Sequence, residues 1–320
     1  MNYHAFVEYL WLDGELPSPG IRSKTRVVWL PQNPKIQDFP KWRFNGAFTG
    51  QSGKEETHCI LKPVRFWPDP FRGEGHFIVL GEVTDSGCNA HETNRRSMLR
   101  VALGNLGNDI RPRLECEQPF SLSDGLETVS TFSADRMAEP HQCHYGLGVR
   151  QVAGREIVDA HATSCLAAGL HFNGYHAGSH PGEWVYQIGL RDEEDELFNP
   201  LDLADDLWLS RYLLMRVSEQ YQVLTDFGSK LNGERSVNGS AHGKLKFKFS
   251  TAYTRDVRCG LTALQVINSA LNQEGQHALV NIPAYVKEQG YGFIIDCRSD
   301  SNSDPYEKGL QLLKLIPQEE

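Results

Sequence analysis

Long hydrophobic runs are missing from this 320-residue sequence. No apolar stretch approaches the roughly 20 residues that cross a bilayer, which argues against a membrane-spanning helix. The opening residues, MNYHAFVEYLWLDGEL, contain no basic segment followed by an apolar one, so we expect no secretory signal there. Their alternation predicts a β-strand instead.

The cysteines lack the spacing of a disulfide framework or a zinc site. There are seven, they are scattered, and no two form a CxxC pair. An odd, dispersed set in a chain of this length is typical of reduced thiols. We therefore expect a cytoplasmic protein in which most cysteines are small core residues.

An excess of positive charge is also absent. The net charge is −9 and the isoelectric point is about 5.8, which argues against general binding to nucleic acid or to an anionic membrane. The sequence contains no GxxxxGK[ST] phosphate loop and no internal repeat. We expect neither a nucleic-acid partner nor a membrane partner.

Strands and turns dominate the first 88 residues. Four segments combine β-forming residues with flanking turn signals, and they are Ala5–Leu12, Lys24–Leu30, His58–Trp67 and Phe77–Val83. The apolar period then changes to that of a helix at Ala90–Leu106. We place a domain boundary between residues 88 and 89.

Helices and strands mix in residues 89–320. The predicted strands are Arg113–Pro119, Trp184–Gly189 and Lys244–Ser250, and the predicted helices are Gly154–Leu170, Asp205–Val223 and Pro305–Ile316. The pattern as a whole predicts an α+β protein of two domains, 1–88 and 89–320.

Several motifs, in order and spanning nearly the whole chain, together resemble glutamine synthetase of the eukaryotic-like type. They lie at Val7–Gly14, Arg22–Arg26, Trp42–Gln51, Asp69–Arg72, Glu92–Arg96, Gly154–His161, Trp184–Gly189, Asp206–Trp208 with Arg211, and Asp304–Tyr306. The resemblance implies an N-terminal β-grasp domain followed by a catalytic-type domain with an antiparallel sheet flanked by helices.

The same resemblance implies a reaction and its cofactors. The family phosphorylates glutamate with ATP and displaces the phosphate with ammonia, using two or three Mg²⁺ or Mn²⁺ ions held by carboxylates. The family's paired metal glutamates match Glu115 and Glu117. Strand alternation places these two side chains on one face.

The other positions that match the family's reactive residues are substituted. Two further metal glutamates match Gly178 and Val185, and the metal histidine matches Lys246, with His242 as an alternative if the strand carries an insertion. The phosphate-contacting arginines match positions near Gln276, Asn281 and Ala284, the last glutamate–arginine pair matches Ile295 and Cys297, and the aspartate that a neighbouring subunit lends matches Asn45. Phosphoryl transfer depends on such cations and metals, so we expect the parent reaction to be lost.

Two like charges on one strand face need a counter-charge. Our preferred hypothesis is that Lys246, from the row Lys244, Lys246 and Lys248, replaces the metal beside Glu115 and Glu117. This would make those three residues the catalytic candidates of a metal-free pocket. An alternative is a solvent-facing lysine row without ion pairs.

A further alternative is a rebuilt metal site. His180 and Glu183 lie in the segment that normally supplies two glutamates. Together with Glu115 and Glu117 they would form a mixed set suited to a single Zn, Mn or Fe ion.

Two functions therefore remain open. The first is a divergent member that acts as a binding, regulatory or assembly partner. The second is a repurposed enzyme, either an ATP-dependent amide ligase with Mg or Mn that acts on another substrate, or a new metal-dependent activity. The resemblance implies a ring-shaped homo-oligomer, or a hetero-oligomer with an active homologue.

Overall fold

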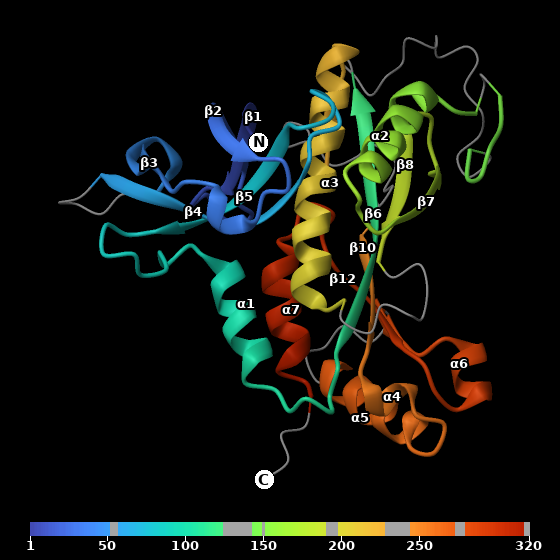
Figure 1. The fold of residues 1–320 in the computed structure, drawn as a ribbon. Coiled ribbons are helices and arrows are strands. Elements are labelled where there is room, and N and C mark those ends of the chain that lie inside the picture. The colour runs from blue at the N-terminus through green and yellow to red at the C-terminus, as the bar shows by residue number, and fades with distance from the viewer. Residues whose placement is uncertain are drawn as a thin grey trace. The chain divides into compact units, whose positions relative to one another are not determined.

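The computed structural model describes residues 1–51, 57–123, 143–148, 151–189, 198–227, 244–272 and 279–316. Within these residues, two sheets and seven α-helices confirm the predicted α+β class (Figure 1). The chain divides into two compact units, residues 1–104 with 164–170, and residues 105–163 with 171–320. The predicted boundary at residues 88 and 89 stays a prediction, and His242 and Gln276 lie outside the described residues.

The first unit contains a five-stranded mixed sheet in the order β2-β1-β5-β4-β3. Its strands are β1 (Asn2–Leu12), β2 (Ile21–Pro31), β3 (Trp42–Asn45), β4 (His58–Pro68) and β5 (Phe77–Thr84), with 3₁₀ turns η1 (Ile36–Asp38) and η2 (Gly46–Thr49) between them. Only β1 and β5 run parallel. Apolar side chains that alternate along β1, such as Val7, Tyr9 and Trp11, form the core of this unit.

Helix α1 (Arg95–Gly104) also belongs to the first unit. It begins later than the predicted Ala90–Leu106 helix because Asn94 caps it: the Asn94 Oδ1 accepts a hydrogen bond from the Ser97 N–H at 3.0 Å.

The second unit contains an antiparallel sheet in the order β11-β12-β10-β6-β8-β7, and β9 pairs with β6 off this path. The strands are β6 (Arg113–Ser123), β7 (Phe172–Ala177), β8 (Glu183–Ile188), β9 (Leu224–Asp226), β10 (Leu245–Ser250), β11 (Val280–Asn281) and β12 (Ile294–Ser299). The central pair, β6 and β10, buries Leu114, Cys116 and Phe247 on one face. Alternation turns the charged residues of both strands to the other face.

Helices of the second unit include α2 (Arg155–Ala167), whose last residues cluster with the first unit, α3 (Pro200–Gln220), α4 (Ala252–Arg255), α5 (Gly260–Asn272), α6 (Ala284–Gln289) and α7 (Pro305–Leu313). Helix α3 starts at a capping box: the Asn199 Oδ1 accepts from the Leu201 N–H at 2.8 Å, and Pro200 occupies the first turn. It packs against α7 and β6. None of the helices in the described residues combines the length and the hydropathy that crossing a bilayer requires.

Candidate functional site

Two ion pairs join the central strands of the second unit. In the β6–β10 register, Lys246 lies opposite Glu117 and Lys248 lies opposite Glu115. The Lys246 Nζ is 3.0 Å from Oε1 and 3.1 Å from Oε2 of Glu117, and the Lys248 Nζ is 3.5 Å from the Glu115 Oε2. Each carboxylate that matches a family metal ligand therefore has an ammonium group beside it.

The third lysine of the row is paired as well. The Lys244 Nζ lies 2.6 Å from the Asp300 Oδ1, so the alternative of a lysine row without ion pairs is wrong. Lys246 contacts the carboxylate that we expected it to neutralise, whereas its role as a catalytic candidate stays a prediction. The side chains of Lys246 and Glu117 are 34% and 18% exposed, so water screens part of their attraction.

Strand β12 adds Ile295 and Cys297 to the same face. Lys248 lies opposite Ile295 in the β10–β12 register, and the inward-facing Phe247 and Asp296 lie opposite each other. Burial raises the pKa of the Cys297 thiol, and the charge on Lys246 opposes that rise. Thus a neutral thiol and an alkyl side chain occupy the positions that match the family's glutamate and arginine.

His180 and Glu183 do not join this cluster. Glu183 lies opposite Ser121 in the β6–β8 register, four residues beyond Glu117, which is roughly 13 Å along the strand. Its Oε2 instead accepts from the backbone N–H of His180 at 3.2 Å and lies 3.1 Å from the His180 Nδ1. The two residues therefore hold together the turn between β7 and β8, and the structure does not bring the four predicted metal ligands together.

Other substituted positions have structural roles of their own. Asn45 caps η2, since its Oδ1 accepts from the Ala47 N–H at 3.0 Å. Gly178 lies so close to Glu183 that an added Cβ would be 2.8 Å from the Glu183 Cβ. Asn281 belongs to β11, and Ala284 begins α6. Neither Asn281 nor Ala284 carries the positive charge that the matched arginines would supply, and neither Asn45 nor Gly178 carries the negative charge of the matched aspartate and glutamate.

A positive cluster lies where β6 begins. The Arg255 guanidinium donates to the Ser250 Oγ at 2.8 Å and to the Arg111 carbonyl at 2.9 Å. Burial, together with the charges of the neighbouring Arg113 and Arg111, lowers the pKa of Arg255 to about 10. The arrangement repels cations and favours an anion.

The described residues do not fit the metal ions that the family resemblance implies. A hard divalent cation needs several free oxygen ligands, but Glu115 and Glu117 each have an ammonium group at 3.0–3.5 Å. Within the described part of the chain, no three His, Cys, Asp or Glu side chains gather as a metal site would require.

The sequence of the chain is similar to those of known proteins. A glutamine synthetase of Streptomyces hygroscopicus is 30% identical over 336 aligned residues, which cover 93% of this chain and 93% of the relative. The chain belongs to the glutamine synthetase family. The glutamine synthetase of Streptomyces viridochromogenes is 29% identical over 93% of each chain, and one from Bradyrhizobium diazoefficiens is 28% identical over 97% of this chain and 95% of the relative.

Solved structures agree on the fold. A cryo-EM structure of Plasmodium falciparum glutamine synthetase matches 98% of this chain and 73% of its own, with a TM-score of 0.71 at 10% sequence identity. No family model matches the chain. The family fold therefore extends over almost the full chain.

Two features of the site were missed from sequence. The Lys248–Glu115 pair depends on the register between β6 and β10, which strand alternation alone does not fix. The Arg111-x-Arg113 spacing is a sequence signal for the arginine cluster. Its third member, Arg255, lies 142 residues after Arg113 in the sequence, so spacing alone does not connect it to the other two.

Proposed function

We propose that this member of the glutamine synthetase family does not catalyse ATP-dependent joining of glutamate and ammonia, and that it acts as a binding, regulatory or assembly partner. The observation that carries the proposal is the ammonium group beside each carboxylate, Lys246 on Glu117 and Lys248 on Glu115. These ion pairs supply the positive charge that metal ions would otherwise supply.

Electrostatics oppose a divalent ion at the same place. Two unit charges of like sign 4 Å apart repel by about 4 kcal/mol at an effective dielectric constant of 20. A divalent ion between Glu115 and Glu117 would face two ammonium groups at comparable distances, unless both lysines first moved away. The loss of metal-assisted phosphoryl transfer follows from this repulsion.

The substituted neighbours support the same proposal. Gly178, Val185 and Ile295 offer no side-chain oxygen ligand, and Cys297 offers only a thiol whose pKa is raised by burial. Hard cations such as Mg²⁺ prefer oxygen ligands, so these side chains do not replace the missing glutamates.

An assembly role is supported by an exposed apolar surface on the first unit. Phe6 and Val27 are paired across β1 and β2, and Trp29 follows on the same face of β2. Their side chains are about half exposed, at 49%, 52% and 56%. Such a surface is typical of protein interfaces. We propose that it takes part in a ring of identical subunits or in a mixed oligomer with an active homologue, in the cytoplasm.

The ligase activity is tested directly by following ¹⁵N-ammonium into glutamine. We expect no product above the protein-free control with glutamate and Mg-ATP or Mn-ATP, and full turnover by the Streptomyces viridochromogenes enzyme under the same conditions. ATP-dependent glutamine formation by the wild-type chain would contradict the proposal.

Metal and nucleotide binding separate the proposal from a repurposed ligase. We expect no saturable Mn²⁺ binding in calorimetry and a melting temperature that Mg-ATP does not change. A ligand that binds the native state raises the melting temperature by mass action, so an unchanged value indicates that Mg-ATP does not bind. A rise of several degrees with Mg-ATP would favour an ATP-dependent ligase acting on another substrate. Lys246→Met, which removes one ammonium group, is the matched variant for the Mn²⁺ titration.

The assembly role has its own measurement. Light scattering after gel filtration gives the oligomer size of the wild type and of Trp29→Lys, and we expect the variant to form smaller species. Phe48→Lys is a control on the same unit, because Phe48 is exposed but lies on η2 rather than on the β1–β2 face. An equal size for all three proteins would exclude this face as the interface.

A further inference from the structure

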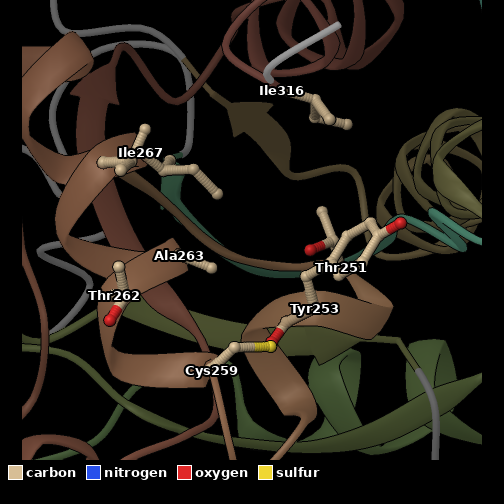
Figure 2. A pocket seen from close by; sticks show the side chains of 8 residues that line it. Thr251, Tyr253, Cys259, Thr262, Ala263, Ile267 and Ile316 are labelled. Carbon is tan, nitrogen blue, oxygen red and sulfur yellow. The ribbon is translucent and has the colours of Figure 1, made fainter. Parts of the chain in front are cut away.

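A cavity of about 280 Å³ opens among the helices that follow β10. Figure 2 shows the side chains that line it, and all of them belong to the second unit. Its lining comes from the N-terminal cap of α4, from α4 and α5, from the residue before α5 and from the segment after α7, and comprises Thr251, Tyr253, Cys259, Thr262, Ala263, Val266, Ile267 and Ile316. No charged side chain belongs to this lining.

Two polar side chains of the lining already form hydrogen bonds of their own. The Thr251 Oγ1 accepts from the Thr254 N–H at 3.2 Å, which caps α4. The Tyr253 hydroxyl donates to the Asp109 carboxylate. Ala263, Ile267 and Ile316 provide apolar surface. A charged ligand would lose its hydration here without gaining a counter-charge.

The size of the cavity limits the ligand further. An apolar cavity of roughly 150 Å³ holds a benzene ring, and pockets for drug-sized ligands begin at roughly 300 Å³. A volume of about 280 Å³ therefore suits a molecule of one to two rings, or a short alkyl chain. The last four residues of the chain, Pro-Gln-Glu-Glu, follow Ile316 in sequence but are mostly polar and acidic, so their chemistry does not match these walls.

We propose that this cavity is a binding site for a small, uncharged, apolar molecule of aromatic or alkyl character. The site is separate from the Lys246–Glu117 cluster, since the two have no residue in common. Binding there requires neither ATP nor a metal ion. Its test is therefore independent of whether the chain forms glutamine.

Cys259 provides a reporter of occupancy. It is an exposed free thiol in the cavity lining, and its Sγ lies 3.6 Å from the Tyr253 carbonyl oxygen (Figure 2). Cys88 is also an exposed free thiol, but it belongs to the first unit and is not part of the lining. A ligand in the cavity shields the first thiol and leaves the second accessible.

The experiment measures alkylation of both thiols by iodoacetamide in one sample, using peptide mass spectrometry. Indole is the probe, and its charged relative indole-3-acetate is the matched control. We expect indole at millimolar concentration to slow labelling of Cys259 by about three-fold or more without changing Cys88. Indole-3-acetate is expected to protect neither thiol. Unchanged labelling of Cys259, or equal slowing of both thiols by indole, would overturn the proposal.

Further measurements test whether the protection of Cys259 depends on the cavity itself. Ala263→Phe fills the cavity and is expected to abolish the protection by indole, with Val266→Ala as a second variant that enlarges it and keeps the protection. An unchanged labelling rate at Cys88 shows that a variant is folded in the first unit, and circular dichroism checks the helices. Slower labelling of Cys259 at higher protein concentration without indole would assign the cavity to a second copy of the chain, which would overturn the small-molecule proposal.

Discussion

Gly189 lies directly against Glu115, at the point where β8 ends beside β6. A Cβ added to Gly189 would be 2.7 Å from the Cγ and 2.9 Å from the Cβ of Glu115, and Gly189 has a φ of 156°. The Gly189 N–H also donates to the His171 carbonyl at 2.9 Å, which fixes this backbone in place. The position of Glu115 therefore depends on the absence of a side chain at residue 189.

We predict that Gly189→Ala destabilises the protein by about 1–3 kcal/mol, since overpacking forces Glu115 or the backbone to move. Urea unfolding monitored by circular dichroism measures the change. Gly104→Ala is the control, because a Cβ there meets no atom within 4 Å. Equal stability of both variants would show that the sheet adjusts without strain.

The Lys246–Glu117 pair is expected to contribute a modest coupling energy. Both side chains are partly exposed, so water and salt reduce the attraction to about 0.5–1 kcal/mol. A double-mutant cycle with Lys246→Met and Glu117→Gln in urea unfolding measures it. The Lys244–Asp300 pair, whose side chains are 39% and 56% exposed, should give a smaller value. A coupling energy of zero for Lys246–Glu117 would mean that the two charges do not stabilise each other. It would contradict the idea that this ion pair replaces the charge of a metal ion.

A buried arginine links motifs that lie far apart in sequence. The Arg211 Nε donates to the Gln118 Oε1 at 2.9 Å, and its Nη2 donates to the carbonyls of Ser301 and Ser303 at 2.9 and 3.1 Å. Burial lowers the pKa of this guanidinium, so its hydrogen bonds must compensate for lost hydration.

We predict that Arg211→Met costs about 3 kcal/mol, because it removes three hydrogen bonds of a buried guanidinium, although the Ser301 carbonyl keeps the hydrogen bond from the Gln118 Nε2. Arg211→Lys should recover part of this loss, since an ammonium group cannot reproduce the fork of the guanidinium. Arg216→Met on the same helix is the control, with a side chain that is 31% exposed. Thermal unfolding compares the three, and similar melting temperatures for the Arg211 and Arg216 variants would contradict the prediction.

Sequence patterns located most of the sheet and the long helices. Alternation in Lys244–Ser250 predicted β10 and its two faces, since Leu245, Phe247 and Phe249 are fully buried. The strand at Arg113 was predicted to end at Pro119, but β6 continues to Ser123. Pro119 lies opposite Val185, and Leu122 still pairs with Thr225 of β9. Pro119 lacks an N–H for the sheet ladder, but pairing with β8 and then β9 extends the strand beyond it.

Other elements required tertiary information. Strand β12 was not predicted because Asp296 lies among its inward-facing residues, where Lys308 and Arg298 neutralise it at 2.7 and 2.9 Å. Helix α5 was missed although Leu264, Ile267 and Leu271 recur at helical spacing and are buried. Within the site, the sequence predicted Lys246 as the counter-charge of Glu115 and Glu117, whereas the register of β6 and β10 pairs it with Glu117 and adds Lys248 as the partner of Glu115.

A buried histidine makes the stability of the second unit depend on pH. His161 is fully buried, its Nε2 donates to the Ser210 carbonyl at 3.0 Å, and burial lowers its pKa to about 4. The unfolded chain takes up the proton near pH 6.5, whereas the folded chain does so only near pH 4. Stability contributed by neutral His161 is therefore fully present above pH 6.5 and falls as the pH decreases toward 4.

We predict that this group alone removes of order 3 kcal/mol between pH 7 and pH 4, from the size of the pKa change. His161→Gln keeps an N–H donor and does not titrate, so it isolates the effect. Urea unfolding of both proteins at half-unit pH steps should show the wild-type stability decreasing more steeply than that of the variant below pH 6.5. Parallel curves over that range would mean that His161 can be protonated in the folded protein without cost, and that its burial does not control the acid stability of this unit.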